Sequence, residues 1–244
     1  MVRVTFLGSG DAFGSGGRFQ ACILLTGGPA PLLLDCGATS LVALKRASVD
    51  PASLGLVLVS HLHGDHFGGV PFLVLDGQFS RREQPLVVAG PVGTAERVSA
   101  AMEVLFPGSS TATRRFETSF VELSPGEPSD LGIAVVTPFP ADHPSGAPAL
   151  SLRVAYGGRV IAYSGDTAWT AALPDVARDT DLFICEGYAA GKAVPYHMRL
   201  ESLRENLQML RARRVVLTHM GPDVLARPGE HPFEYASDGA TFDV

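Results

Sequence analysis

Hydrophobic positions along the chain gather in short clusters that are separated mostly by Gly, Pro, Asp and Ser. Many clusters are rich in β-branched residues, which is typical of buried strands bounded by turns. The pattern predicts about eleven strands, over residues 2–7, 21–26, 32–34, 56–60, 86–89, 120–123, 133–137, 150–156, 160–163, 182–185 and 215–218.

Helical spacing is found in fewer places, over residues 39–47, 68–79, 94–105 and 199–213. The last segment is the clearest, because apolar residues recur on one face while Arg, Glu and Gln occupy the other. Its apolar face consists of Leu200, Leu203, Leu207 and Leu210. Since no linker or low-complexity stretch interrupts these elements, we expect one domain of mixed α and β structure over residues 1–244.

Composition narrows the class of protein. Of the 244 residues, 46% are hydrophobic and 18% are charged, which favours a globular body over a disordered chain. The formal net charge of −6 offers no general attraction for nucleic acid or for an anionic membrane. An anionic ligand would therefore need a locally cationic site.

Cysteine usage and the N-terminal segment bear on the compartment. The three cysteines, at positions 22, 36 and 185, are odd in number, far apart and set in apolar stretches, so we expect them to be buried and reduced. The N-terminus lacks the apolar core of a signal peptide. No apolar run approaches the ~18 residues that cross a bilayer. We expect a soluble, cytoplasmic protein with no membrane partner.

The densest chemistry lies in the stretch from Ser60 to Gly69, which reads SHLHGDHFGG and follows the apolar strand predicted to end at Ser60. His61 and His63 are two residues apart, so at a strand end their side chains point to the same side. A turn through Gly64 can bring Asp65 and His66 back toward them. Neutral imidazoles and carboxylates are ligands of zinc and similar ions, so this stretch predicts a metal site.

This run resembles the His-x-His-x-Asp-His signature of the metallo-β-lactamase superfamily. Two weaker similarities precede it in the family's order: a first strand and Gly-rich loop at residues 7–13, and a strand ending in Asp-x-Gly at residues 33–37. The resemblance extends over nearly the whole chain. It implies an α/β fold, the four-layer αββα sandwich, that carries a metallohydrolase site.

The family needs three further ligands, and candidates follow predicted strands at His143, Asp166 and His219. The resemblance assigns one metal to His61, His63 and His143, and a second metal to Asp65, His66 and His219. Asp166 would bridge the two ions. The implied cofactors are two divalent ions, with zinc expected and Mn²⁺ or Fe²⁺ also compatible with N and O ligands. Their shared water would act as a bridging hydroxide.

Two details are similar to the ribonuclease Z and cyclic phosphodiesterase branch of the superfamily. His143 is followed by Pro-Ser-Gly-Ala-Pro, and the chain carries Glu186 on a strand with His197 ahead of the last predicted helix. The resemblance implies that His197 donates a hydrogen bond or proton to the scissile phosphate and leaving oxygen. Glu186 would hold the imidazole and favour its protonated form, while Asp65 would orient the hydroxide.

The chain departs from ribonuclease Z in one respect. That family carries a long basic arm that clamps tRNA, commonly between the bridging Asp and the final His, whereas residues 189–195 are all the loop available here, with Lys192 as its one cation. We therefore expect a phosphodiesterase for small anionic phosphodiesters or cyclic nucleotides, without a nucleic-acid polymer as partner.

Three alternatives stay open on the sequence: an ester, lactone or thioester hydrolase, a tRNA 3′-processing endonuclease, and a non-catalytic binding module. A homodimer is compatible with the sequence.

Overall fold

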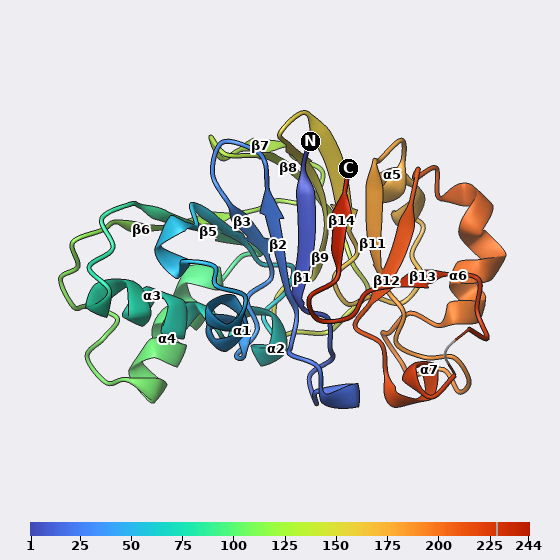
Figure 1. Cartoon of the computed structure of the whole chain (residues 1–244), viewed down its shortest axis with the longest axis horizontal. Helices are drawn as coiled ribbons and strands as arrows, with labels where there is room; N and C mark the ends of the chain where they lie inside the picture. Colours follow the sequence, from blue (N-terminus) through green and yellow to red (C-terminus); the bar gives the residue numbers. More distant parts are fainter. Residues whose placement is uncertain (228) are drawn as a thin grey trace.

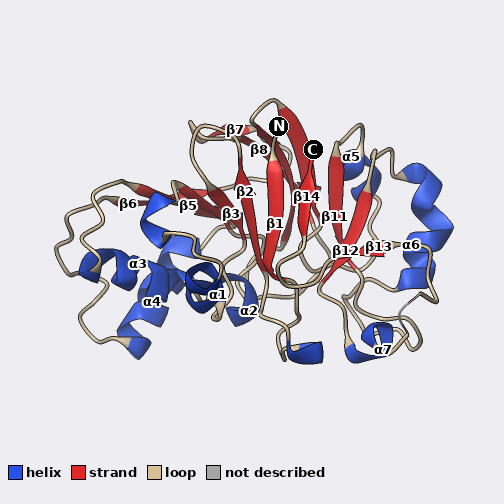
Figure 2. Cartoon of the chain, viewed as in Figure 1, coloured by secondary structure: helices blue, strands red, loops and turns tan. Residues whose placement is uncertain are grey.

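Residues 1–227 and 229–244, which the computed structural model describes, form two seven-stranded sheets packed face to face with helices on both outer surfaces (Figures 1 and 2). The first sheet has the order β14-β1-β2-β3-β4-β5-β6 and the second has the order β13-β12-β11-β10-β9-β8-β7. The expected αββα sandwich is confirmed.

The first sheet is antiparallel from β14 to β3 and parallel from β3 to β6. Its strands are β1 (Arg3–Gly8), β2 (Cys22–Thr26), β3 (Leu32–Leu34), β4 (Leu56–Leu58), β5 (Leu86–Gly90), β6 (Thr118–Glu122) and β14 (Thr241–Asp243). Beside it lie α1 (Ser40–Arg46), α2 (Gly64–Phe67), α3 (Val70–Phe79) and α4 (Thr94–Leu105).

The second sheet is antiparallel from β7 to β10 and parallel from β10 to β13. Its strands are β7 (Ser129–Asp130), β8 (Val135–Pro140), β9 (Leu150–Tyr156), β10 (Arg159–Tyr163), β11 (Leu182–Glu186), β12 (Val215–Thr218) and β13 (Glu234–Tyr235). Beside it lie α5 (Leu173–Ala177), α6 (Leu200–Asn206) and α7 (Pro222–Leu225). Short 3₁₀ turns cover Ser15–Gly17, Pro51–Ser53 and Leu207–Met209.

Three apolar layers hold the sandwich together. The middle layer packs the two sheets against each other through residues such as Phe6, Leu34 and Leu152. Each outer layer packs one sheet against its helices, with Val57 and Leu73 on one side and Phe183 and Leu203 on the other. Strands buried on both faces explain why their sequences are continuously apolar rather than alternating.

Most predicted elements agree with the structure to within a few residues, but the helix predicted over residues 199–213 is too long. It ends at Asn206, continues as a 3₁₀ turn and then becomes extended. The helix ends early because its C-terminal part bonds to a distant segment of the chain. Arg211 O accepts a hydrogen bond from Asp179 N, and Arg213 N donates one to Thr180 O. These bonds to the segment before β11 draw the chain out of the helix and into β12.

The strand count was also low. Within the described ranges there are fourteen strands, and the three that the pattern missed are β7, β13 and β14. They contain two or three residues each, which is too short for a hydrophobic pattern to register. All three cysteines are unpaired and buried, as expected. None of the described helices has the length and apolar character to cross a membrane.

Candidate metal centre

The predicted site residues meet at one edge of the sandwich. Residues 59–66 follow β4, and Asp166, Glu186 and His219 follow or end β10, β11 and β12, which are parallel to one another. His143 follows β8, which runs in the same direction as β10 because two antiparallel pairings intervene. Carboxyl ends of such strands share an edge, so residues far apart in the chain come together there.

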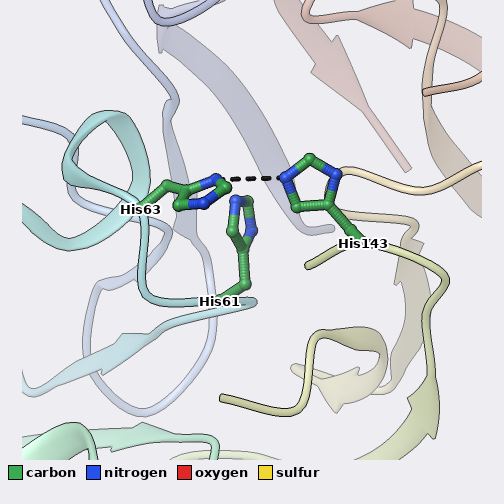
Figure 3. Close-up of side chains that lie close together, drawn as sticks. All are labelled: His61, His63 and His143. Atoms are coloured by element: carbon green, nitrogen blue, oxygen red, sulfur yellow. Dashed lines mark hydrogen bonds between the residues drawn. The ribbon is translucent and has the colours of Figure 1, made fainter. Parts of the chain in front are cut away.

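The first group consists of His61, His63 and His143, whose ring nitrogens lie within 4.8 Å of one another (Figure 3). His63 Nδ1 is 3.0 Å from His143 Nε2. His143 Nδ1 donates to the Tyr196 carbonyl at 3.0 Å, which leaves His143 Nε2 to face the centre with a free lone pair.

Ser60 fixes the tautomer of His61. The Ser60 hydroxyl donates its one hydrogen to Asp35 Oδ2 at 2.8 Å. Ser60 Oγ can therefore only accept from His61 Nδ1, which lies 3.1 Å away. The lone pair of His61 is therefore on Nε2, which is buried and has no hydrogen-bond partner among the described residues. An unsatisfied buried acceptor of this kind fits a metal ligand.

The second group contains Asp65, His66, Asp166 and His219, again with ligand atoms within 4.8 Å. Asp65 Oδ2 lies 3.2 Å from both His66 Nε2 and His219 Nε2. Asp166 faces both groups: Oδ1 is 3.3 Å from His66 Nε2, and Oδ2 is 3.9 Å from His61 Nε2 and 3.9 Å from His143 Nε2. One carboxylate thus presents an oxygen to each group.

The protonation preferences of the histidines differ between the groups. Burial lowers the pKa of His61 well below its ordinary value, and burial with the nearby His143 lowers the pKa of His63. Burial also acts against charge on His219, but Asp166 and Asp65 outweigh it and raise the pKa of His219 to about 10. His61 and His63 therefore favour the neutral imidazole, and the carboxylates of the second group attract positive charge, as a cation site requires.

Behind the ligands lies Asp35, a residue that the sequence analysis noted only as part of Asp-x-Gly. Its fully buried carboxylate accepts from Ser60 N at 2.7 Å, His66 Nδ1 at 2.6 Å and Tyr163 Oη at 2.8 Å. The first contact holds the strand end and the second directs His66 Nε2 toward the centre. The sequence does offer one sign of this role: Asp35 is an acidic residue directly after an apolar strand, and no neighbouring residue explains its presence there.

Replacing Asp35 by asparagine should loosen the second group. An amide has only one acceptor atom, because its nitrogen is a donor. It cannot accept from all of these donors, so His66 loses its orientation. We expect metal affinity to fall by about 10- to 100-fold, measured by competition with a chromophoric chelator. Tyr163→Phe removes one donor and leaves the carboxylate, so it serves as the milder control; equal metal affinity in wild type and Asp35→Asn would contradict this role.

The glycine of Asp-x-Gly lets two loops approach. A Cβ on Gly37 would lie 2.2 Å from the Asp65 carbonyl oxygen and 2.8 Å from Gln20 Cβ. Cys36 N also donates to the His66 carbonyl at 2.6 Å. The loop after β3 thus braces the loop that carries Asp65 and His66, and a methyl group at position 37 would push them apart.

Gly37→Ala should therefore displace the ligands by a backbone shift. We expect a loss of about 1–3 kcal/mol in the free energy of unfolding, measured by urea denaturation, together with weaker metal binding. Gly64→Ala is the matched control in the loop that Gly37 packs against, because a Cβ on Gly64 meets nothing within 4 Å. The explanation fails if both alanine variants unfold at the same urea concentration.

Glu186, which is buried, and His197, which is half-buried, form a pair beside both groups. His197 Nδ1 donates to Glu186 Oε1 at 2.5 Å, and Glu186 Oε2 accepts from Thr167 N at 2.8 Å and Met198 N at 3.1 Å. Partial burial opposes charge on His197, but the bond and charge of Glu186 outweigh it and raise the pKa of His197. The ring of Tyr188 stacks on His197 with centroids 4.4 Å apart.

These groups face a cavity of about 200 Å³. It is lined by Ala12, Phe13, His63, Asp65, His143, Asp166, Tyr188, His197 and His219. None of the described residues that line it is a lysine or an arginine. Phe13 and Tyr188 are two lining residues to which the sequence analysis assigned no role, since a single aromatic in a loop carries no recognisable pattern.

Comparison with known proteins agrees with this geometry. The family model described as "Beta-lactamase superfamily domain" matches residues 31–220, which is more than half of the chain. This chain belongs to the metallo-β-lactamase superfamily. Among curated relatives, ribonuclease Z of Methanosarcina acetivorans is 26% identical over 90% of this chain and 88% of its own length. An uncharacterized protein of Mycobacterium tuberculosis is 31% identical over 91% and 81%.

Two solved structures share the fold over nearly their whole length. The short form of human tRNase Z superposes with a TM-score of 0.81 at 24% identity, covering 99% of both chains. A diphosphatase of the PhnP family superposes with a TM-score of 0.77 at 18% identity, covering all of this chain and 98% of the other. The chain is therefore a metallo-β-lactamase-fold hydrolase related to ribonuclease Z, with His and Asp clusters suited to metal ions.

Proposed function

We propose that this superfamily member is a metal-dependent phosphodiesterase that acts on small phosphodiesters such as cyclic nucleotides. Two divalent ions, expected to be zinc, would be held by the seven residues that the sequence analysis selected: His61, His63, Asp65, His66, His143, Asp166 and His219. The whole chain would act as one domain. The unpaired cysteines support a reducing, cytoplasmic compartment, and a homodimer stays a prediction.

The observation that carries the proposal is the Glu186–His197 pair at the cavity wall. Cleavage of a phosphodiester expels an alkoxide, which needs a proton in the transition state. His197 keeps Nδ1 on Glu186, so Nε2 is the nitrogen that can donate to the leaving oxygen. The buried carboxylate stabilises the imidazolium and fixes the ring plane, which favours the protonated form of His197 that an acid catalyst needs.

The other residues position the reactants. Asp65 lines the cavity, where its carboxylate can orient the attacking hydroxide. When bound, the two ions would supply a low pKa for the water that yields this hydroxide and neutralise charge on the phosphate. Asp166 and the five histidines would hold those ions beside His197, whose Nδ1 is 3.9 Å from Asp166 Oδ2, so the ions and the proton donor would contact the same phosphate.

The substrate is proposed to be small for two reasons. The cavity has no lysine or arginine among its described lining residues, and these are the side chains that usually contact the repeated phosphates of a nucleic acid. The alignment with the Methanosarcina acetivorans ribonuclease Z is 272 positions long, which exceeds the 244 residues of this chain. That relative therefore contains insertions, which supports the view that this chain lacks a tRNA-binding arm.

A kinetic panel tests the proposal. Metal-loaded protein would be assayed with cyclic nucleotides, a linear dinucleotide, precursor tRNA, a lactone and a thioester. We expect turnover of the small phosphodiesters, with kcat/KM at least about 100-fold above that for the lactone or thioester. Efficient hydrolysis of the lactone or thioester with the phosphodiesters left intact would overturn the proposal in favour of acyl chemistry. Preferred cleavage of precursor tRNA would overturn the substrate size.

A further inference from the structure

Phe13 is an aromatic side chain that the fold leaves unpacked at the mouth of the catalytic cavity. Its relative exposure is 85%, although it lines the same cavity as the metal-site residues. Single exposed apolar residues are common on proteins. This one differs because it borders a cavity whose floor is formed by histidines and carboxylates.

The loop that carries Phe13 is held in place by hydrogen bonds. The buried Asp11 carboxylate accepts from Phe13 N at 3.2 Å, Ser15 N at 2.8 Å and Ser15 Oγ at 2.6 Å. Gln20 Nε2 donates to the Ala12 carbonyl at 3.1 Å. The backbone that carries Phe13 is thus held in place, while the described residues leave its side chain 85% exposed. A held backbone reduces the entropy lost when a ligand binds.

The size of the cavity indicates where a ligand would extend. At about 200 Å³ it is smaller than the ~300–1,000 Å³ of ordinary ligand sites. A phosphodiester placed against the polar floor therefore leaves the rest of a nucleotide at the mouth. The Tyr188 ring already stacks on His197, whereas the Phe13 side chain is 85% exposed and therefore open to a ligand.

We propose that Phe13 stacks on a planar, aromatic group of the substrate, so that the site selects nucleotides over aliphatic phosphodiesters. This inference deepens the proposed function and rests on it. Stacking tolerates any base because every base has a π-face, and it needs no hydrogen-bond donor from the loop. Phe13 acts here as a specificity determinant, because it contributes to the affinity for the base and takes no part in bond cleavage.

The test compares ligands with and without a base. Binding of adenosine 5′-monophosphate and of ribose 5-phosphate to metal-loaded protein would be measured by calorimetry for wild type, Phe13→Ala, Phe13→Leu and Phe13→Tyr. We expect Phe13→Ala and Phe13→Leu to weaken nucleotide binding by about tenfold, with ribose phosphate binding unchanged. Phe13→Tyr should bind like wild type. Phe79→Ala is the matched control, because Phe79 is 79% exposed at the end of α3, away from the cavity.

The outcomes separate this inference from the proposed function. Equal losses for both ligands in Phe13→Ala, or no loss for either, would overturn the stacking role while phosphodiester turnover by wild type still stood. A base-dependent loss in Phe13→Ala, measured on protein that hydrolyses no phosphodiester, would support stacking and overturn the proposed reaction instead. Rescue by tyrosine but not by leucine distinguishes an aromatic contact from mere apolar contact.

Discussion

Asp166→Asn is expected to abolish turnover and to leave the protein with less than its full complement of metal. Asp166 presents one oxygen to His66 and the other to His61 and His143. An amide keeps the shape but removes the negative charge and one of the two acceptors. Since bound metal supplies several kcal/mol of transition-state stabilisation, we expect kcat to fall by about 10³-fold or more.

The measurement is metal content by elemental analysis after dialysis, together with phosphodiester turnover. Asp142→Asn is the matched control, because Asp142 is an exposed neighbour of His143 whose side chain lies outside both ligand groups. The Asp166→Asn variant should fold normally, because the contacts of this carboxylate are with the other proposed ligands rather than with the apolar core. Full metal content and wild-type turnover in Asp166→Asn would show that this residue does not bridge the two groups.

His197→Ala should lower turnover by about 10²-fold or more while metal content stays at the wild-type level. His197 lies against the cavity and is bound to Glu186, but it is not one of the seven proposed ligands. The loss should depend on the leaving group. A nucleoside or alkyl alkoxide needs the proton and suffers the full loss, whereas p-nitrophenolate is a stable anion and needs little help.

Comparing these two classes of phosphodiester separates acid catalysis from phosphate binding. A group that only contacts the phosphate would affect both classes equally, mainly through KM. His231→Ala serves as the control histidine, because His231 lies outside the catalytic cavity. Unchanged turnover of the alkyl phosphodiesters in His197→Ala would eliminate the proposed acid.

Local patterns marked the proposed metal-site residues as candidates because each lies shortly after an apolar strand and is of a type that can bind metal. The run from His61 to His66 is dense enough to predict a metal by itself. His143, Asp166 and His219 each have ordinary structural explanations, and only the resemblance assigned them. The structure brings all of them within reach of one another, and their binding of metal stays a prediction.

Tertiary relations explain what the sequence did not reveal. Asp35 contacts Ser60, His66 and Tyr163, which are 25, 31 and 128 positions away, so its role depends on two sheets meeting. The helix beginning at Leu200 ends early because of hydrogen bonds to residues before β11. The exposure of Phe13 beside the cavity depends on how the surrounding loops fold, so no local sequence pattern predicts it.

Anomalous X-ray diffraction from crystals of zinc-loaded protein would show whether the two groups bind metal, because it locates metal ions independently of any activity. We expect two zinc peaks on either side of Asp166, about 3.5–4 Å apart. One should lie within bonding distance of His61, His63 and His143, and the other within bonding distance of Asp65, His66 and His219. No zinc peak at these residues, or a single peak that leaves one group without metal, would contradict the proposed two-metal site.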